Sequence, residues 1–153
     1  MYMTMTDYIQ KLRAEDVPPS WNICRNHECP KREECLRYVA APIVEAVRDH
    51  GPAVYQSALV NGKCRMFHRL RVIRTAWGLR PLFSKIRHED YNFLRSEVIC
   101  YFGSRSQYFR YNRGDYRLTP EQQEEVLDIF RCQGYDTTDF RFAHYEDTID
   151  FIS

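Results

Sequence analysis

Four of the six cysteines in this chain lie within its first 64 residues, and their spacing restricts how that part can fold. Three of them form a Cys-x4-Cys-Pro-x4-Cys segment, and the fourth follows a predicted turn. Four thiolates can complete a tetrahedral zinc site, or they can hold an iron–sulfur cluster. We therefore predict a metal site that ties the segment after Pro19 to a central hairpin, with the ligands Cys24, Cys29, Cys35 and Cys64.

The spacing leaves the identity of the metal open. There is no Cys-x2-Cys knuckle of the kind common in structural zinc sites, and the Cys-Pro pair and wide gaps are compatible with an iron–sulfur cluster. His27 or His68 could replace one thiolate in a mixed site. Free cysteines that pack as small apolar residues are the alternative without a metal. Zinc is the expected cofactor, with an iron–sulfur cluster or no metal as alternatives. Cys100 and Cys132 fall on predicted helices and are expected to be core or surface thiols.

The rest of the sequence indicates a protein of the cytoplasm. The first residues lack a basic segment followed by an apolar one, so no secretory signal is expected. No apolar run reaches the roughly 20 residues that a membrane helix needs. In a reducing compartment the thiols stay free for metal, and we expect no membrane partner.

Capping and periodicity predict several helices. Thr119-Pro120-Glu121-Gln122 combines an N-cap, a proline in the first turn and a capping-box glutamine, so a helix should follow and end at Gly134. Apolar residues on one side predict another helix over 89–102, with Gly103 as its stop. Shorter helices are predicted over 5–15, with Thr6 as a cap, and over 31–40 and 43–49, on either side of Pro42.

Asn61-Gly62 is a tight-turn signal between 54–59 and 64–73, and it predicts an antiparallel hairpin. The region 104–117 shows no clean period and reads as a loop or an edge strand, and 140–142 alternates like a short strand. The expected fold is a single compact α+β domain over 1–153, rich in helix. Its segments are an N-terminal helix and link (1–20), a Cys-rich segment (21–64), and a basic, aromatic middle with an acidic C-terminal helix and tail (65–153).

Charge is unevenly distributed, although the whole chain carries a formal charge of only +1. Residues 61–117 contain thirteen basic and four acidic side chains, and eleven of the basic ones are arginine. Residues 118–153 contain two basic and nine acidic side chains. Arginine forks hydrogen bonds to phosphate and stacks on rings, and aromatic rings stack on unpaired bases. The densest stretch predicts a nucleic-acid-binding surface, with RNA favoured over a specific DNA site, made of Arg105, Tyr108, Arg110, Tyr111 and Arg113.

Two alternatives compete with that interpretation. The acidic C-terminal segment could fold back onto the basic middle and neutralise it. The same arginines could instead contact an acidic protein, which would make the chain an adaptor or regulatory subunit. An iron–sulfur or thiol redox sensor is a further alternative. None of the common catalytic or nucleotide-binding motifs occurs, so we name no catalytic residue and lean against an enzyme. An acidic cluster near the C-terminus is expected to be a solvated surface: His144, Glu146, Asp147 and Asp150.

The order of several short motifs also carries a resemblance. Trp21 and the three clustered cysteines are followed by Gly62-Lys63-Cys64, Ala76-Trp77-Gly78, Tyr101-Phe102-Gly103-Ser104, Tyr108-Phe109-Arg110-Tyr111 and the capped helix that starts at Leu118-Thr119-Pro120. This order resembles a family of small uncharacterised proteins from gut Bacteroidota, over about residues 20–145. The resemblance implies a self-contained domain of unknown function and supplies no catalytic residues.

Overall fold

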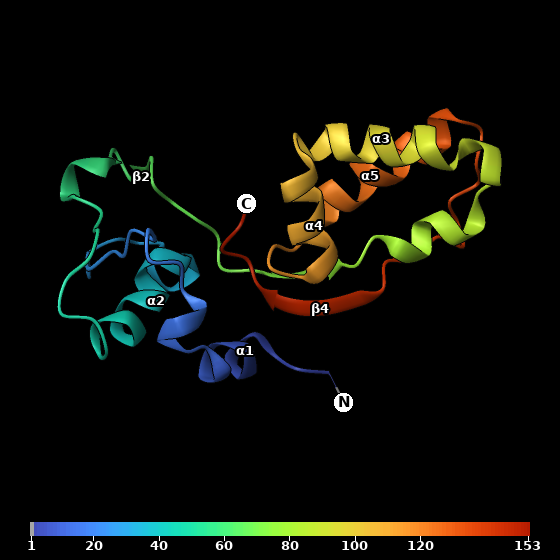
Figure 1. Cartoon of the computed structure of the whole chain (residues 1–153). Coiled ribbons are helices and arrows are strands. Elements are labelled where there is room, and N and C mark those ends of the chain that lie inside the picture. Colours follow the sequence, from blue (N-terminus) through green and yellow to red (C-terminus); the bar gives the residue numbers. More distant parts are fainter. Residues whose placement is uncertain (1) are drawn as a thin grey trace. The chain divides into compact units, whose positions relative to one another are not determined.

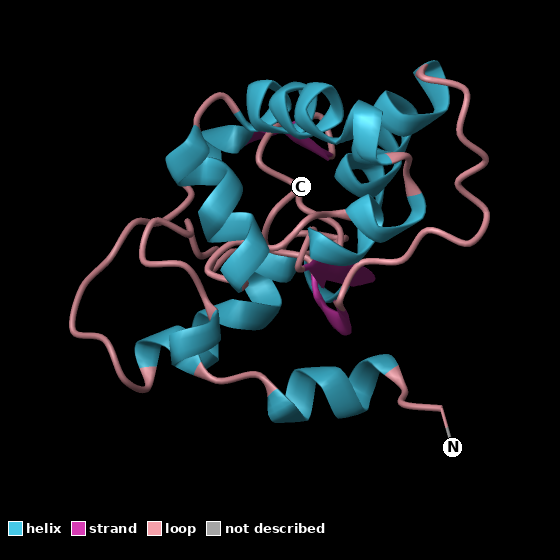
Figure 2. Cartoon of the chain, turned by 45° about the vertical axis from the view of Figure 1, so that its right-hand side comes forward, coloured by secondary structure: helices cyan, strands magenta, loops and turns pink. Residues whose placement is uncertain are grey.

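A computed structural model describes residues 2–153, and helices make up most of its regular structure (Figures 1 and 2). The strands form two sheets of two strands each, so the expected helix-rich α+β class is confirmed. Contacts between residues divide the chain into two compact units. Unit 1 comprises Met1–Val72 with Ile149–Ser153, and unit 2 comprises Ile73–Thr148.

Unit 1 begins with the short helix α1, Met5–Lys11. The helix predicted over 5–15 is therefore present but shorter. Its N-cap is Thr4 rather than Thr6, because Thr4 and Asp7 bond each other's backbone N–H in a capping box. The helix ends at Lys11, since the backbone of Leu12 is extended.

A single helix, α2 (Leu36–Glu45), replaces the two that were predicted on either side of Pro42. That prediction is wrong because Leu36, Ala40 and Val44 form one buried stripe that continues past the proline. Burial of this stripe offsets the backbone hydrogen bond that Pro42 cannot donate. The helix starts later than expected because Cys35 is extended and forms an antiparallel bridge with Arg69.

The predicted hairpin is confirmed, with shorter strands than expected. β1 (Leu59–Val60) pairs antiparallel with β2 (Lys63–Cys64), and Leu59 lies opposite Cys64. The turn between them places Asn61 at φ 51° and Gly62 at φ 74°. Two positive φ angles are what a two-residue turn of this kind requires, and Asn-Gly is the pair that adopts them most easily.

The apolar core of unit 1 is small and comes mainly from its two helices and the link between them. Among the described residues, no member of this core lies between Glu45 and Arg69. Its buried residues are Val17, Trp21, Leu36, Ala40, Val44 and Ile149.

Unit 2 is built on three helices: α3 (Tyr91–Phe102), α4 (Arg105–Arg113) and α5 (Pro120–Cys132). α3 packs against both α4 and α5 (Figure 1). The capping box of Thr119 and Gln122 starts α5, and Gly103 in a left-handed conformation ends α3, as predicted. β3 (Val72–Trp77) pairs with β4 (His144–Ile149). The most deeply buried core residues of unit 2 are Ala76, Leu79, Leu82, Leu94, Val98, Leu118, Val126 and Phe130.

Residues 104–117 contain the helix α4, so the prediction of a loop or edge strand is wrong. Ser104 caps the helix by accepting a hydrogen bond from the backbone N–H of Gln107, and Gly114 ends it in a left-handed conformation. The buried face consists of Tyr108 and the half-buried Tyr111, which are one helical turn apart. Because the apolar but exposed Phe109 lies between them, the helical spacing of the buried residues cannot be recognised in the sequence.

The strand predicted at 140–142 is also wrong, because the strand of this region begins at His144. Phe140 and Phe142 are buried in the core of unit 2 without strand pairing. The backbone N–H of Phe140 bonds the carbonyl of Thr137, and Arg141 donates to the carbonyls of Thr138 and Phe140. These local bonds satisfy the backbone without a partner strand.

Gly114 provides a test of the packing between the end of α4 and β3. We expect Gly114→Ala to lower the free energy of unfolding more than Gly134→Ala does. Both glycines have φ 88°, which costs a non-glycine residue roughly 1–2 kcal/mol. Only at Gly114 would the new Cβ also lie 2.6 Å from the indole of Trp77, whereas nothing lies within 4 Å at Gly134. We expect an additional loss of about 1–3 kcal/mol at Gly114, measured by urea unfolding. Equal losses in the two variants would contradict this packing.

Candidate functional site

The four cysteines predicted to bind metal line one small cavity in unit 1. Its volume is about 20 Å³. Its other lining residues are Arg32, Arg37, Tyr38, Val54, Met66 and Phe67. Cysteines from three separate parts of the chain therefore line this cavity: Cys24 and Cys29 from the loop before α2, Cys35 from the start of α2, and Cys64 from the hairpin.

Backbone contacts position these cysteines. The N–H of Cys24 donates to the carbonyl of Arg37 at 2.9 Å. Cys35 is held between the start of α2 and the bridge to Arg69, and Cys64 is held in β2. Cys35 is buried, whereas Cys24, Cys29 and Cys64 are half-buried. All four cysteines line the cavity, but within residues 2–153 no three His, Cys, Asp or Glu side chains form a group ready to hold an ion.

Neither candidate histidine lines this cavity. A ring nitrogen of His27 lies 2.7 Å from the hydroxyl of Tyr38, outside the ring of thiols. Nε2 of His68 lies 2.9 Å from the backbone carbonyl of Asp150, and its ring meets the edge of Trp21. The remaining cysteines, Cys100 and Cys132, are exposed on α3 and α5.

The five residues predicted to contact nucleic acid all lie on α4, but they divide into two groups. Tyr108 is only 5% exposed and belongs to the core. Tyr111 is half-buried and stacks on Phe102 with ring centroids 4.5 Å apart. Both tyrosines therefore hold α4 in place and present little ring surface to a base. The arginines at 105, 110 and 113 are exposed.

Not all arginines of unit 2 have a carboxylate partner. Arg113 pairs with Asp115 at 2.8 Å, within the turn that follows α4. Within residues 2–153, four arginines of unit 2 near or on α3 and α4 form no ion pair: Arg80, Arg95, Arg105 and Arg110. Sequence reasoning did not single out Arg80 and Arg95, because they are distant from α4 along the chain.

The packing of α3 on α4 brings Arg95 against Tyr108 of α4, which also feels the charge of Arg80. The guanidinium of Arg95 lies 5.7 Å from the ring centre of Tyr108. Burial raises the pKa of Tyr108, against the opposite effects of a hydrogen bond from Arg95 and of the charge on Arg80. Arg95 of α3 thus lies against this buried tyrosine, and the charge of Arg80, in the segment before α3, also acts on it.

The acidic C-terminal segment neutralises a different set of arginines. Glu146 pairs with Arg117, and Asp147 lies 3.7 Å from Arg74, both within unit 2. In unit 1, Asp150 bonds Nε of Arg71 at 2.8 Å. The acidic side of α5 is used locally, since Glu124 and Asp128 pair with Arg131 of the same helix. The expected internal pairing is therefore present, but it leaves the arginines around α4 unpaired.

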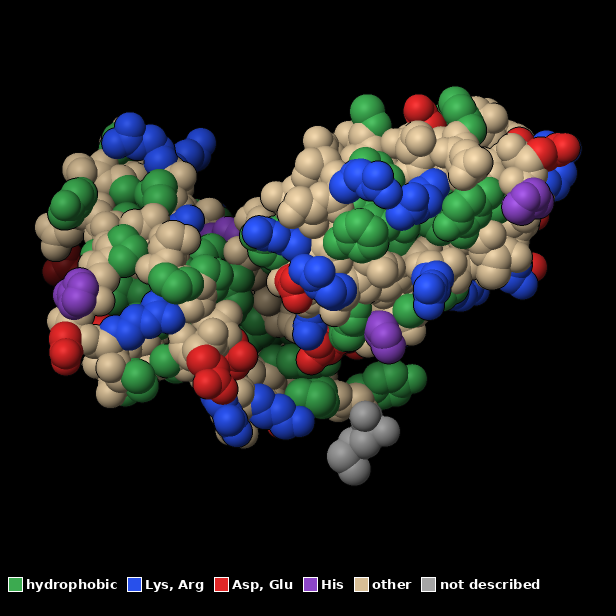
Figure 3. Space-filling model, in the orientation of Figure 1, with side chains coloured by type: hydrophobic (Ala, Val, Ile, Leu, Met, Phe, Trp, Pro, Cys, Tyr) green, Lys and Arg blue, Asp and Glu red, His purple; other side chains and the backbone are tan. Residues whose placement is uncertain are grey.

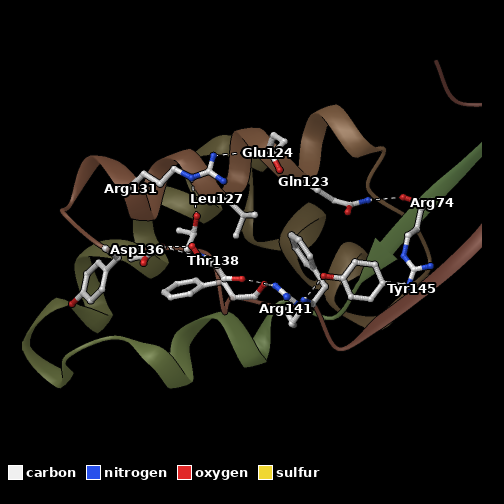
Figure 4. A pocket seen from close by; sticks show the side chains of 13 residues that line it. Arg74, Gln123, Glu124, Leu127, Arg131, Asp136, Thr138, Arg141 and Tyr145 are labelled. Atoms are coloured by element: carbon white, nitrogen blue, oxygen red, sulfur yellow. Dashed lines mark hydrogen bonds and ion pairs between the residues drawn. The ribbon is translucent and has the colours of Figure 1, made fainter.

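A larger, open pocket of about 710 Å³ lies beside α5 in unit 2 (Figure 4). Figure 4 shows Arg131 and Glu124 on one wall and Arg141 and Tyr145 on the other. Its polar groups bond one another: Arg131 bonds Glu124 and Thr137, and Arg141 bonds backbone carbonyls. The pocket therefore offers few free donors to a ligand, and we assign it no role.

The carboxyl group of Asp150 is fully buried, and its environment can be tested by pH. Burial acts to raise the pKa of this carboxyl. The N–H groups of Ser153 and Ile152 and the guanidinium of Arg71 outweigh burial and lower the pKa below its usual value. A carboxyl with a lowered folded-state pKa stabilises the protein above its unfolded pKa of about 3.9 and loses that effect as pH falls through the folded value.

We therefore expect Asp150→Asn to lower the free energy of unfolding by about 1–3 kcal/mol at neutral pH. The difference from the wild type should shrink as pH falls from about 4 through the lowered folded-state pKa, where the Asp150 carboxyl becomes neutral like the amide. Urea unfolding across this pH range provides the measurement, and Asp147→Asn, at an exposed pair, is the control with an expected loss of about 0–1 kcal/mol. A loss at Asp150 that does not change with pH would contradict this assignment.

Comparison with known proteins adds a family but no activity. Among the described residues, no helix is both long and apolar enough to cross a membrane. No curated protein matches the chain, and no solved structure matches it. A family model described as a family of unknown function, DUF6078, matches residues 5–151 and so covers both units. The expected membership of an uncharacterised family is confirmed: the chain belongs to the DUF6078 family.

Proposed function

We propose that this chain is a small binding module that binds single-stranded or structured nucleic acid, with RNA favoured, through unit 2. The observation that supports the proposal is the group of unpaired arginines around α3 and α4. Tyr91 and Phe109 are exposed rings one helical turn from Arg95 and Arg105, and with the unpaired arginines they form what we call the arginine–aromatic surface: Arg80, Arg95, Arg105, Arg110, Tyr91 and Phe109.

The charge of this surface supports binding to a phosphate backbone. Arginines already bonded to carboxylates have little to gain from phosphate, whereas unpaired ones release counterions from the nucleic acid when they bind. On the face of unit 2 seen in Figure 3, Lys and Arg side chains gather around hydrophobic ones over α3, α4 and the segment before α3. Arg110 also donates to the hydroxyl of Tyr116 at 2.8 Å, which holds its guanidinium at the surface.

The aromatic part of the surface supports single-stranded or unpaired bases. Phe109 is 40% exposed and Tyr91 is 39% exposed, so each presents ring surface to solvent. Rings next to arginines are the arrangement that stacks on bases while cations follow the backbone.

Other parts of the sequence-based interpretation are also retained as proposals: a cytoplasmic location, an origin in gut Bacteroidota, and the Cys-x4-Cys-Pro-x4-Cys segment as a family feature. An acidic protein partner is the competing interpretation of the same surface. It predicts capture of a protein that survives nuclease treatment, together with no binding of RNA.

Neutralising the unpaired arginines should weaken RNA binding and its dependence on salt. We expect Arg105→Gln with Arg110→Gln to reduce the slope of log affinity against log salt by about 1.4, since each phosphate contact to a single strand contributes about 0.7. Fluorescence anisotropy with a labelled oligouridine and a labelled RNA hairpin measures this. Arg113→Gln on the same helix is the control, because Asp115 already neutralises that arginine. If the double variant keeps the wild-type slope, the surface is wrongly assigned.

Removing one exposed ring should weaken binding without changing the salt dependence. We expect Phe109→Ala to lower the affinity for oligouridine by about 1–3 kcal/mol, which is the usual contribution of one base stacked on a ring. The matched control is Tyr55→Ala, which removes a ring that is 82% exposed in unit 1. The same anisotropy assay applies, and an equal effect of both variants would argue against stacking at Phe109.

A further inference from the structure

We propose that unit 1 binds one zinc ion in a tetrahedral site whose ligands are the thiolates of Cys24, Cys29, Cys35 and Cys64. This inference is independent of the proposed nucleic-acid surface, which lies in unit 2. The sequence leaves open a zinc ion, an iron–sulfur cluster, a mixed Cys/His site and free thiols. Four features of unit 1 favour zinc with four sulfur ligands.

The first feature is the convergence of the thiols. Four of the six cysteines, from three separate segments, line a single cavity, and the other two are exposed on helices of unit 2. Cysteines that served only as small apolar residues would be distributed through the core. Three of these four are instead only half-buried, and the buried one, Cys35, lies outside the main apolar cluster of unit 1.

The second feature is the size of the cavity. A volume of about 20 Å³ is close to the roughly 10–15 Å³ that a single water molecule requires. One metal ion fits in such a space. Even the smaller [2Fe–2S] cluster adds two irons and two sulfides between its cysteines, so it would need a larger rearrangement of this cavity than a single ion does.

The third feature is the chemistry of the lining. No carboxylate and no imidazole lines the cavity among the described residues, and the one hydroxyl there, of Tyr38, already bonds His27, so the four thiols are the ligands that it offers. A zinc ion with four thiolates carries a net charge of −2, which needs compensation in a partly buried site. Arg32 and Arg37 line the cavity, and Arg37 is held there by hydrogen bonds to the carbonyls of Met66 at 2.7 Å and Asn22 at 3.1 Å.

The fourth feature is the weak apolar support of this part of unit 1. Between Glu45 and Arg69 the described segment buries one apolar residue, Ala58, and adds none to the main apolar cluster of unit 1. A few backbone bonds attach it, among them the one from the N–H of Val54 to the carbonyl of Ile23 at 2.8 Å. Small units that lack a large core are commonly stabilised by a structural metal. A zinc ion shared by Cys64 and the cysteines around α2 would join this segment to the rest of the unit.

Binding requires the thiols to move inward and to lose protons. Each sulfur would come to about 2.3 Å from the zinc, and the four protons would pass to solvent, so that no oxidant or reductant is needed. Cys24 and Cys29 lie in a loop without regular secondary structure, which leaves them free to make this adjustment. An adjoining pocket of about 150 Å³, lined by Cys24, Cys29 and Cys64, provides a path for the ion.

The test is the metal content of the untagged full chain, produced with both zinc and iron in the medium and purified without oxygen. We expect about one zinc per chain, no iron or sulfide, and no visible colour. Replacing zinc by cobalt should give the intense visible bands of a tetrahedral cobalt–thiolate site. Cys29→Ser and Cys64→Ser should each lose most of the metal, whereas Cys100→Ser and Cys132→Ser should retain it.

A thiol count on the wild type keeps the proposal testable if the ligand variants fail to fold. In the zinc form only the two exposed cysteines should react rapidly with a thiol reagent, and the other four should react after a strong chelator removes the metal. Iron with sulfide would overturn the single-ion site. Protein without metal that does not bind added cobalt, or full metal retention in Cys29→Ser and Cys64→Ser, would overturn the zinc site.

Discussion

Ion pairs made by β4 and by the residues that follow it determine which arginines of this chain already have a carboxylate partner. Arg71 forms an ion pair with Asp150, Arg74 with Asp147, and Arg117 with Glu146. The buried Asp150 also accepts the backbone N–H groups of Ile152 and Ser153, so this contact orders the end of the chain as well. Arg80, Arg95, Arg105 and Arg110 form no ion pair with these or with other carboxylates of the described residues. The proposed function of unit 2 depends on that division of charge.

Unit 1 has a different physical problem. Its apolar core joins α1, α2 and the link between them, but it does not extend to the hairpin and its flanking loops. Backbone hydrogen bonds between extended segments are worth little on their own when water competes for them. Zinc–sulfur bonds to cysteines from both parts of the unit would not face this competition from water. The proposed zinc ion would therefore hold the hairpin in place, as side-chain packing holds the helices.

Local signals predicted the elements whose ends are marked by a few residues. The capping box at Thr119, the stop at Gly103 and the Asn61-Gly62 turn all act over a few residues, and each has the predicted structure. α4 was missed because only two of its side chains are buried and an exposed phenylalanine separates them. The two helices predicted around Pro42 form one, because burial of a continuous apolar stripe outweighs the preference of proline to end a helix.

The sequence by itself determined the fold class, the positions of the best-capped helices and the four cysteines that come to line one cavity. These features follow from local backbone preferences and from a spacing that a reader of the chain can see. Only the tertiary structure decided the rest: that Tyr108 is buried and not a ring for bases, that Arg95 lies against α4, and that the cavity lined by the four cysteines has a volume of about 20 Å³. The physical reason is that burial, ion pairing and cavity volume arise from contacts between residues distant in the chain, which no local pattern encodes.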